Sequence, residues 1–172
     1  MQHTRLRGLP ASAAPTGVAR SGGQPVPTWG DGRHSRIGLL GGSFNPAHRW
    51  HQAIARRALL ELRLDQVWLL VSPGNPLKAG REMASFATRL ATARSLADGR
   101  KVVATDLEAR LGTRYTVDTL ARLKARFPHV RVVWLMGADG LVTLPRWKHW
   151  HQLVRQVPLA VFPRPGQNVR AL

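Results

Sequence analysis

The sequence contains no cysteine, which excludes disulfide bonds and thiolate metal sites and leads us to expect a reducing, cytoplasmic environment. It also lacks any apolar run near the roughly 20 residues that a membrane-spanning helix requires. Its longest apolar segments, such as Val130–Met136, have the length of strands. Acidic residues are few, since 9 Asp and Glu face 26 Lys and Arg and the net charge is +17. A surface this basic attracts phosphate-bearing partners, either nucleoside triphosphates or nucleic acids.

The chain has 172 residues, 44% of them hydrophobic, which is enough for one domain with its own core. Residues 1–34 differ from the rest, because they are rich in Gly, Pro, Ser and Ala and carry several arginines without the apolar region of a secretory signal. We interpret them as a disordered or mis-annotated basic leader, with an organelle transit peptide as the alternative. Residues 35–172 then form the folded domain.

After the leader, short apolar runs alternate with helical patterns. The expected strands are Ile37–Leu40, Val67–Val71, Val102–Ala104, Val130–Met136 and Leu159–Phe162. The expected helices are the segment after Asn45-Pro46, then Met83–Leu96, Thr116–Phe127 and His149–Val157. Continuously apolar strands that alternate with helices predict an α/β fold, a Rossmann-like, doubly wound and mainly parallel sheet with helices on both faces. Ligands bind such sheets beyond the carboxyl ends of the strands.

The segment after the first strand carries the chemistry. Gly41 and Gly42 permit a tight turn and a close approach of the backbone to a ligand. Asn45 followed by Pro46 is typical of a helix N-terminus, where free N–H groups favour anions. His48 and its neighbour three residues on, His51, would share one helix face. This arrangement predicts a phosphate site with two imidazoles, and the alternatives are an unrelated surface pair or a metal site.

The stretch from Gly41 to His51 resembles the signature Gly-x-Phe-Asp-Pro-x-His-x-Gly-His of the nucleotidyltransferase superfamily. The resemblance implies that His48 and His51 are catalytic and bind the phosphates of ATP, with Mg²⁺ carried on the triphosphate and no metal site of the protein's own. It also implies ATP contacts from the residues before them, which are Gly41, Gly42, Ser43 and Phe44. Class I aminoacyl-tRNA synthetases have a similar His-x-Gly-His element, so this stretch defines the superfamily and not the substrate.

Trp50 departs from that signature, which has glycine between the two histidines. Glycine lets the nucleotide lie close to the helix, and an indole would block or shift that approach. Asn45 in place of the commoner Asp is a milder change, because both residues cap helices and accept hydrogen bonds.

Further segments, in the same order along the chain, are similar to bacterial nicotinate-nucleotide adenylyltransferases. They are Val71–Lys78, Met83–Ala91, Tyr115–Leu120, Met136–Asp139, Leu144–Trp150 and Phe162–Gly166. The resemblance implies that Lys78 and Thr116 bind substrate, that Gly137 allows adenine to pack, that Asp139 bonds a ribose hydroxyl, and that Trp147 stacks on the pyridine ring. The plain alternatives are a solvated loop lysine, helix caps at Thr116 and Asp139, and tryptophans that only anchor the core.

The expected function is transfer of the adenylyl group of ATP to nicotinate mononucleotide, which gives deamido-NAD and pyrophosphate in NAD biosynthesis. The alternatives are pantetheine-phosphate or nicotinamide-mononucleotide adenylyltransferase, and a basic nucleic-acid-binding protein. A Ser-Ser/Thr-x-x-Ile-Arg element that the family carries near its C-terminus has no match in Gln167–Leu172. Two further hypotheses are therefore a domain truncated at its C-terminus and a catalytically impaired relative.

Overall fold

The computed structural model describes residues 34–74 and 82–163, which contain a five-stranded sheet flanked by helices. The strands are β1 (Arg36–Gly42), β2 (Gln66–Val71), β3 (Val102–Thr105), β4 (Arg131–Gly137) and β5 (Leu159–Phe162). The helices are α1 (Arg49–Glu61), α2 (Phe86–Leu96), α3 (Leu107–Leu111), α4 (Thr116–Arg126), α5 (Ala138–Thr143), the 3-10 turn η2 (Leu144–Arg146) and α6 (Trp150–Gln156). Within these residues, no helix has the length and apolar character needed to cross a membrane.

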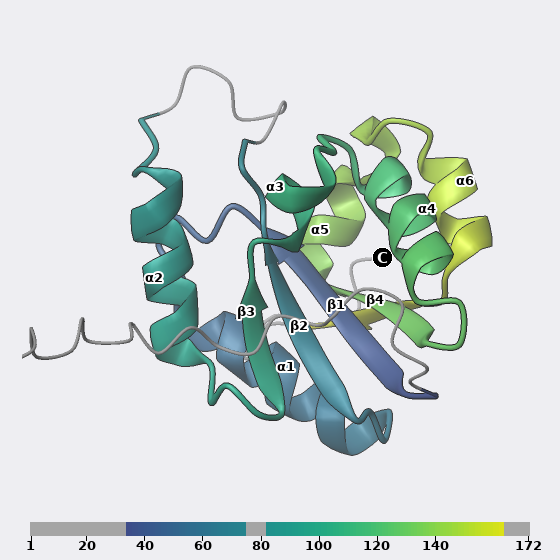
Figure 1. Ribbon diagram of the computed structural model, residues 1–172, viewed down its shortest axis with the longest axis horizontal. Coiled ribbons are helices and arrows are strands. Elements are labelled where there is room, and N and C mark those ends of the chain that lie inside the picture. The colour runs from purple at the N-terminus through teal and green to yellow at the C-terminus, as the bar shows by residue number, and fades with distance from the viewer. Residues whose placement is uncertain (1–33, 75–81, 164–172) are drawn as a thin grey trace, which may run out of the picture.

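All strands are parallel and follow the order β3-β2-β1-β4-β5, so β1 lies in the centre of the sheet (Figure 1). Leu40 of β1 pairs with Leu69 of β2 on one side and with Leu135 of β4 on the other. The strand order reverses at β1, and open parallel sheets bind ligands beyond the carboxyl ends of the strands at such a point. The topology confirms the predicted parallel, doubly wound α/β sheet.

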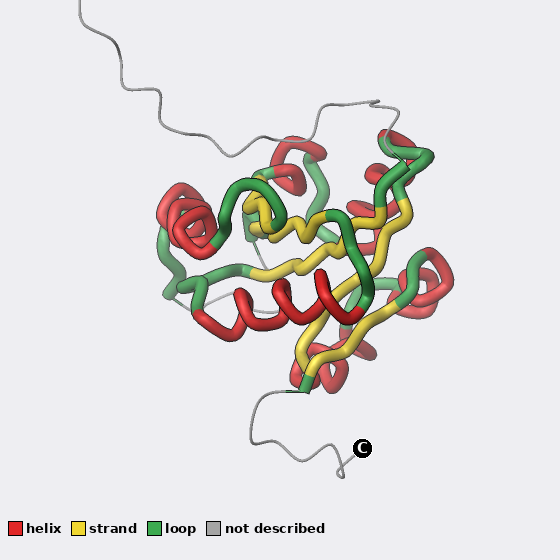
Figure 2. The backbone as a smooth tube through the Cα atoms, turned by 90° about the horizontal axis from the view of Figure 1, so that it is seen from below, coloured by secondary structure: helices red, strands yellow, loops and turns green. Residues whose placement is uncertain are grey.

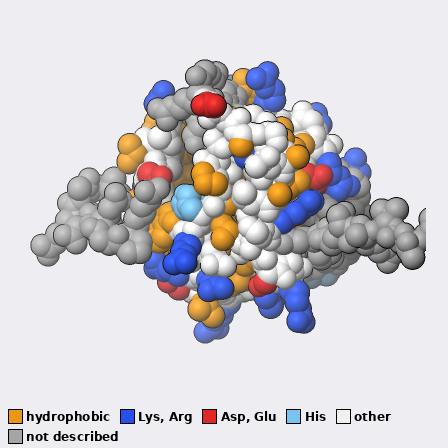
Figure 3. Space-filling view, turned by 90° about the vertical axis from the view of Figure 1, so that its left-hand side faces the viewer, with side chains coloured by type: hydrophobic (Ala, Val, Ile, Leu, Met, Phe, Trp, Pro, Cys, Tyr) orange, Lys and Arg blue, Asp and Glu red, His pale blue; other side chains and the backbone are white. Residues whose placement is uncertain are grey.

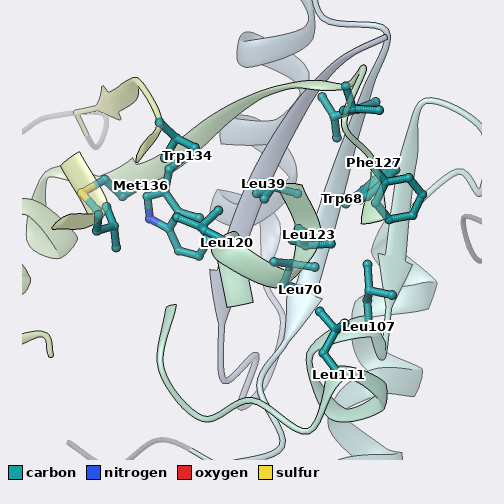
Figure 4. Packing of buried hydrophobic residues seen from close by; sticks show 14 of the residues in the cluster. Leu39, Trp68, Leu70, Leu107, Leu111, Leu120, Leu123, Phe127, Trp134 and Met136 are labelled. Carbon is teal, nitrogen blue, oxygen red and sulfur yellow. The ribbon is translucent and has the colours of Figure 1, made fainter. Parts of the chain in front are cut away.

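Helices cover both faces of the sheet (Figure 2). Consecutive strand residues point to opposite faces, so Leu39 belongs to the core under α3, α4 and α6 and Leu40 to the core under α1 and α2. The first core includes Trp68 and Phe127, whose ring centroids are 5.6 Å apart in an edge-to-face contact (Figure 4). Full burial of each such side chain contributes about 1.5–3 kcal/mol. Burial of both faces explains why these strands are continuously apolar.

The prediction that the first helix begins at Asn45-Pro46 is wrong. Helix α1 begins at Arg49, and its N-cap is His48. The side chain of Asn45 is engaged elsewhere, because its Oδ1 accepts a hydrogen bond from the backbone N–H of Ala84 at 3.1 Å and its Nδ2 donates to Glu82 O at 3.4 Å. These partners are distant in sequence, so the local pattern gave no indication of them.

The start of α2 and the cap of α4 also differ from the sequence prediction. Helix α2 begins at Phe86 instead of Met83, because Ser85 caps it and its Oγ accepts the Thr88 N–H at 3.1 Å. Helix α4 begins at Thr116 as predicted, but its N-cap is Tyr115 and not Thr116. Helices α3 and α5 are short and were not predicted, since five or six residues give too little periodicity to recognise.

Candidate active site

A pocket of about 270 Å³ lies at the carboxyl ends of β1 and β4, where the strand order reverses. It is lined by all eight residues that were predicted to bind ATP, which are Gly41, Gly42, Ser43, Phe44, His48, His51, Gly137 and Asp139. Trp147 lines the same pocket, whereas Thr116 does not. Lys78 lies outside the described residues. The fold therefore brings the glycines at the ends of β1 and β4, two histidines and one carboxylate to a single point.

The two histidines lie against each other at the start of α1. Their ring centroids are 3.9 Å apart, and the backbone N–H of His48 donates to Nδ1 of His51 at 3.2 Å. An Nδ1 that accepts a hydrogen bond carries no proton, so the proton of the neutral His51 ring is on Nε2. His48 is exposed and His51 is half-buried. The predicted pairing of the two imidazoles is present, although His48 caps the helix instead of lying in its first turn.

Phe44 packs its ring against the ring of His51. Its ring is buried and lies 4.7 Å from the ring of His51, centroid to centroid. Its backbone is in the left-handed region, with φ of 49°. The segment between β1 and α1 thus buries Phe44 in the core, where its ring contacts the ring of His51.

Two of the glycines that line the pocket have no space for a side chain. A Cβ added at Gly41 would overlap Cη2 of Trp134 and lie 2.8 Å from Cζ2 of the same ring. A Cβ added at Gly137 would lie 2.5 Å from Oδ1 of Asp139. Gly41 therefore requires glycine for packing reasons, whereas a Cβ at Gly137 would displace the movable carboxylate of Asp139.

Trp50 projects into this arrangement. It lines the pocket, and its Nε1 lies 3.4 Å from the position that a Cβ on Gly137 would take. Nε1 of Trp50 and Nε1 of Trp134 are buried and have no hydrogen-bond partner among the described residues. Nε1 of Trp50 thus lies close to Gly137 at the end of β4.

Trp147 reaches the pocket from η2. It is half-buried and meets Trp134 edge to face, with ring centroids 6.1 Å apart and an interplanar angle of 88°. Trp150, by contrast, lies on His151, with ring centroids 3.7 Å apart, and does not line the pocket. Of these two tryptophans, only Trp147 is placed to touch a ligand in this pocket.

Thr116 lies close to side chains whose contacts stabilise the start of α4. Thr119 Oγ1 contacts Thr113 Oγ1 at 2.8 Å and donates to Glu108 Oε1 at 3.3 Å. Nearby, the Nζ atom of Lys148 lies 4.3 Å from the ring centroid of Tyr115. The side chains around Thr116 thus hold α3, α4 and the segment before α6 together.

Glu108 gives the stability of the fold a dependence on pH. The side chain is buried, and desolvation raises the pKa of its carboxyl group to about 7 from an ordinary value of 4.5, although the Thr119 hydroxyl acts in the opposite direction. Between these values the folded chain keeps a proton on Glu108 that the unfolded chain has released, so the contribution of this group to stability falls as pH rises and is constant on either side. We expect a loss of roughly 3 kcal/mol across that window in denaturant titrations of the wild-type protein.

The variant Glu108→Gln keeps a hydrogen-bonding side chain and removes the titration. It should therefore show a nearly flat dependence over the same pH range and exceed the wild type in stability at pH 8. Equal slopes for the two proteins would contradict the assignment.

A second hollow, of about 810 Å³, lies at the opposite end of the sheet, between residues that precede the strands, such as Ser35 and Lys101. Its polar side chains form hydrogen bonds with the backbone of the neighbouring turns. Asp98 Oδ1 accepts backbone N–H groups, and Lys101 Nζ donates to Asp65 O. Open parallel sheets bind ligands at the other end. The smaller pocket is therefore the candidate active site.

Arg89 and Asn45 are the organising residues that sequence reasoning missed. Arg89 is 3% exposed, and its guanidinium donates to the carbonyl of Ser43 beside the pocket at 2.7 Å. Asn45 lines the pocket and bonds the segment before α2. An arginine in the apolar pattern of α2 was the one available signal for a buried cation, and it did not identify the partners.

Comparison with known proteins places this site in a family. A model of the cytidylyltransferase-like family matches residues 39–171. A protein of Gluconacetobacter diazotrophicus described as a probable nicotinate-nucleotide adenylyltransferase is 61% identical over 147 residues, which are 86% of this chain and 68% of that protein. The chain belongs to this family and to its nicotinate-nucleotide adenylyltransferases. A relative from Gluconobacter oxydans with the same description is 66% identical over 137 residues, which cover 80% of this chain and 70% of the relative.

Solved structures share the fold of this family member. The nicotinic acid mononucleotide adenylyltransferase of Plasmodium falciparum complexed with NaAD has a TM-score of 0.64 at 15% sequence identity, and the match covers 78% of both chains. The same enzyme complexed with APC gives a TM-score of 0.59 at 15% identity, covering 78% of this chain and 77% of that one. At such identities the likeness concerns the fold alone. Family membership makes the chain a nucleotidyltransferase.

Proposed function

We propose that the protein transfers the adenylyl group of ATP to nicotinate mononucleotide, with deamido-NAD and pyrophosphate as products. The observation that carries the proposal is the pair of histidines beside the glycines that end β1 and β4, in a pocket at the carboxyl ends of these strands. Relatives that cover most of the chain are described as enzymes of this activity. The step belongs to NAD biosynthesis and is expected in the cytoplasm.

The reaction requires positioning and charge stabilisation more than covalent chemistry. An oxygen of the mononucleotide phosphate attacks the α-phosphorus of ATP in line, and the bond from that phosphorus to pyrophosphate breaks. Nε2 of His51 carries the ring proton and is a donor for a phosphate oxygen, because Nδ1 is occupied by the N–H of His48. His48 lies beside it and offers a second imidazole. Donors of this kind stabilise charge that grows in the transition state.

The nucleotides would occupy the two sides of the histidine pair. In this proposal Gly41 and Gly42 admit the triphosphate, and Gly137 and Asp139 receive adenosine, with the carboxylate bonding a ribose hydroxyl. Trp147 offers an aromatic face to the pyridine ring, and its edge-to-face contact with Trp134 holds its orientation. Thr116 does not line the pocket, so its substrate contact stays a prediction from the family resemblance.

Mg²⁺ is expected to arrive on the triphosphate. Among the described residues there is no cluster of three or more His, Asp or Glu side chains suited to a metal ion. The lining of the pocket contains one carboxylate, that of Asp139. Because that carboxylate is assigned to a ribose hydroxyl, Mg²⁺ would be held by substrate phosphates and water. The metal would neutralise phosphate charge, while the histidines and glycine turns position the reacting groups.

The decisive experiment supplies ATP and Mg²⁺ with nicotinate mononucleotide and, in parallel, with nicotinamide mononucleotide or phosphopantetheine. Faster formation of deamido-NAD supports the proposal, and a preference for either other acceptor would replace it by the corresponding adenylyltransferase. A folded protein that forms no product with any of the three would instead be a catalytically impaired relative.

Nucleic-acid binding is the second candidate, and the basic composition is the observation in its favour. On the face shown in Figure 3, Lys and Arg side chains stand apart from one another and do not form one continuous patch. Binding that weakens steeply with salt, with a slope that counts several phosphate contacts, would revive this candidate.

Trp50 makes a testable contribution to the rate. Trp50 lines the pocket of about 270 Å³, which is smaller than typical ligand sites of roughly 300–1,000 Å³, so removal of the indole should enlarge it. We expect Trp50→Gly to raise kcat/KM for ATP by about tenfold, equivalent to about 1.4 kcal/mol. Trp50→Ala separates the effect of space from that of a glycine in the first turn of α1. Steady-state kinetics in which both variants lose activity would show that the indole assists binding.

A further inference from the structure

Arg89 joins the segments that surround the pocket. Its Nη1 donates to Ser43 O and to Ser72 O, each at 2.7 Å, and its Nη2 donates to Pro73 O at 3.1 Å. Its Nε donates to Ala84 O at 3.0 Å. One side chain of α2 thus holds the loop after β1, the loop after β2 and the segment before its own helix.

This guanidinium is unusual in its surroundings. The residue is 3% exposed, and all four of these acceptors are backbone carbonyl oxygens, which carry no full charge. The ring of Phe86 lies 5.5 Å from its Cζ and adds a cation–π contact. Burial lowers the pKa of Arg89, which shows that the charged form is held at a cost. A buried cation is kept in a fold where its planar set of donors fits several acceptors at once.

The segments that Arg89 holds lead directly to the histidines. Ser43 precedes Phe44, whose ring contacts His51, and the Ser72 N–H donates to Gly42 O at 2.9 Å. A shift of the Ser43 carbonyl would therefore move the glycine turn and the support of the imidazole pair together. Arg89 does not line the pocket, so its influence on a ligand is indirect.

We propose that Arg89 is a positioning residue, which sets the loop after β1 so that His48 and His51 face the α-phosphate. The proposed effect on turnover rests on the proposed function, whereas the effect on the loops does not. Lysine cannot reproduce the role, because a single ammonium group lacks the planar fork that reaches carbonyls of three segments.

The test compares Arg89→Lys with the wild type. A displacement of about 1 Å at reacting groups costs on the order of 100-fold in rate, so we expect kcat to fall by about that factor. KM for the mononucleotide should stay nearly unchanged, since Trp147 follows η2 and none of the four hydrogen bonds of Arg89 reaches that segment. The control is Arg57→Lys, an exposed arginine bound to Glu61 at 2.8 Å, which should leave both parameters unaltered.

Hydrogen exchange followed by NMR provides the independent readout. In Arg89→Lys the Ser72 amide should exchange faster, while amides in the middle of β1 and β4 keep their protection. The milder variant Phe86→Leu keeps the four hydrogen bonds and should show both effects more weakly, which guards against a lysine variant that does not fold.

Unchanged kcat together with unchanged exchange would overturn the proposal, and so would an activity loss that merely follows the unfolded fraction. If the wild-type protein makes no dinucleotide, the proposed function fails, while faster exchange at Ser72 still supports the role of Arg89.

Discussion

Replacing His51 by alanine is expected to lower kcat by a factor of about 10²–10³, the usual cost of losing one donor to a developing oxyanion. Nε2 of His51 is the best-defined donor in the pocket, because the His48 N–H occupies Nδ1 and the Phe44 ring supports the imidazole. His48→Ala should reduce the rate by a similar factor. Initial rates of deamido-NAD formation at saturating substrates measure both effects.

The matched control is His129→Ala. His129 stacks on His34, with ring centroids 4.8 Å apart, and does not line the pocket. Circular dichroism and thermal unfolding should show that all three variants remain folded. If His51→Ala and His48→Ala keep the wild-type rate, the phosphate site has been assigned to the wrong residues.

A methyl group at Gly41 is expected to destabilise the fold by about 1–3 kcal/mol, the range for overpacking a dense core. The added Cβ would overlap the six-membered ring of Trp134, which is 3% exposed and cannot turn aside. Chemical denaturation of Gly41→Ala measures the loss. Because Gly41 also lines the pocket, the variant should bind ATP more weakly as well.

Two further variants identify the cause of this effect. Gly74→Ala is the control, because a Cβ there meets no atom within 4 Å. Trp134→Phe shortens the ring, so in this background the cost of Gly41→Ala should shrink, and a double-mutant cycle gives the coupling. Additive effects of the two substitutions would mean that Gly41 is required for another reason.

The strands, and the convergence of the site residues that follow them, were predictable from sequence for a physical reason. Burial on both faces produces continuous apolar runs, and parallel strands place the residues after their carboxyl ends together. Gly41, His51 and Gly137 therefore converge although their helices and turns were only partly foreseen. The predictions that depended on this geometry, and on resemblance to a family, gave the fold class and the family correctly.

Helix starts and buried polar contacts were not predictable in the same way. Asn45 has the residue type of a cap, but its amide bonds Glu82 and Ala84, which are far along the chain. The expectation that Thr116 caps its helix is wrong, because the N-cap of α4 is Tyr115. Arg89 gives no local signal of the loops that it joins. Such choices depend on tertiary partners, which periodicity and propensity do not encode.

The position of β1 in the centre of the sheet has a consequence for synthesis of the protein. Its neighbour β2 follows closely in the chain, whereas β4, with Gly137 at its end, is made much later. During translation the histidine pair and its glycine turn thus leave the ribosome with one wall of the pocket missing. The complete pocket forms only after β4 has joined the sheet, so we expect bound nucleotide to stabilise only a chain in which β4 is already in place.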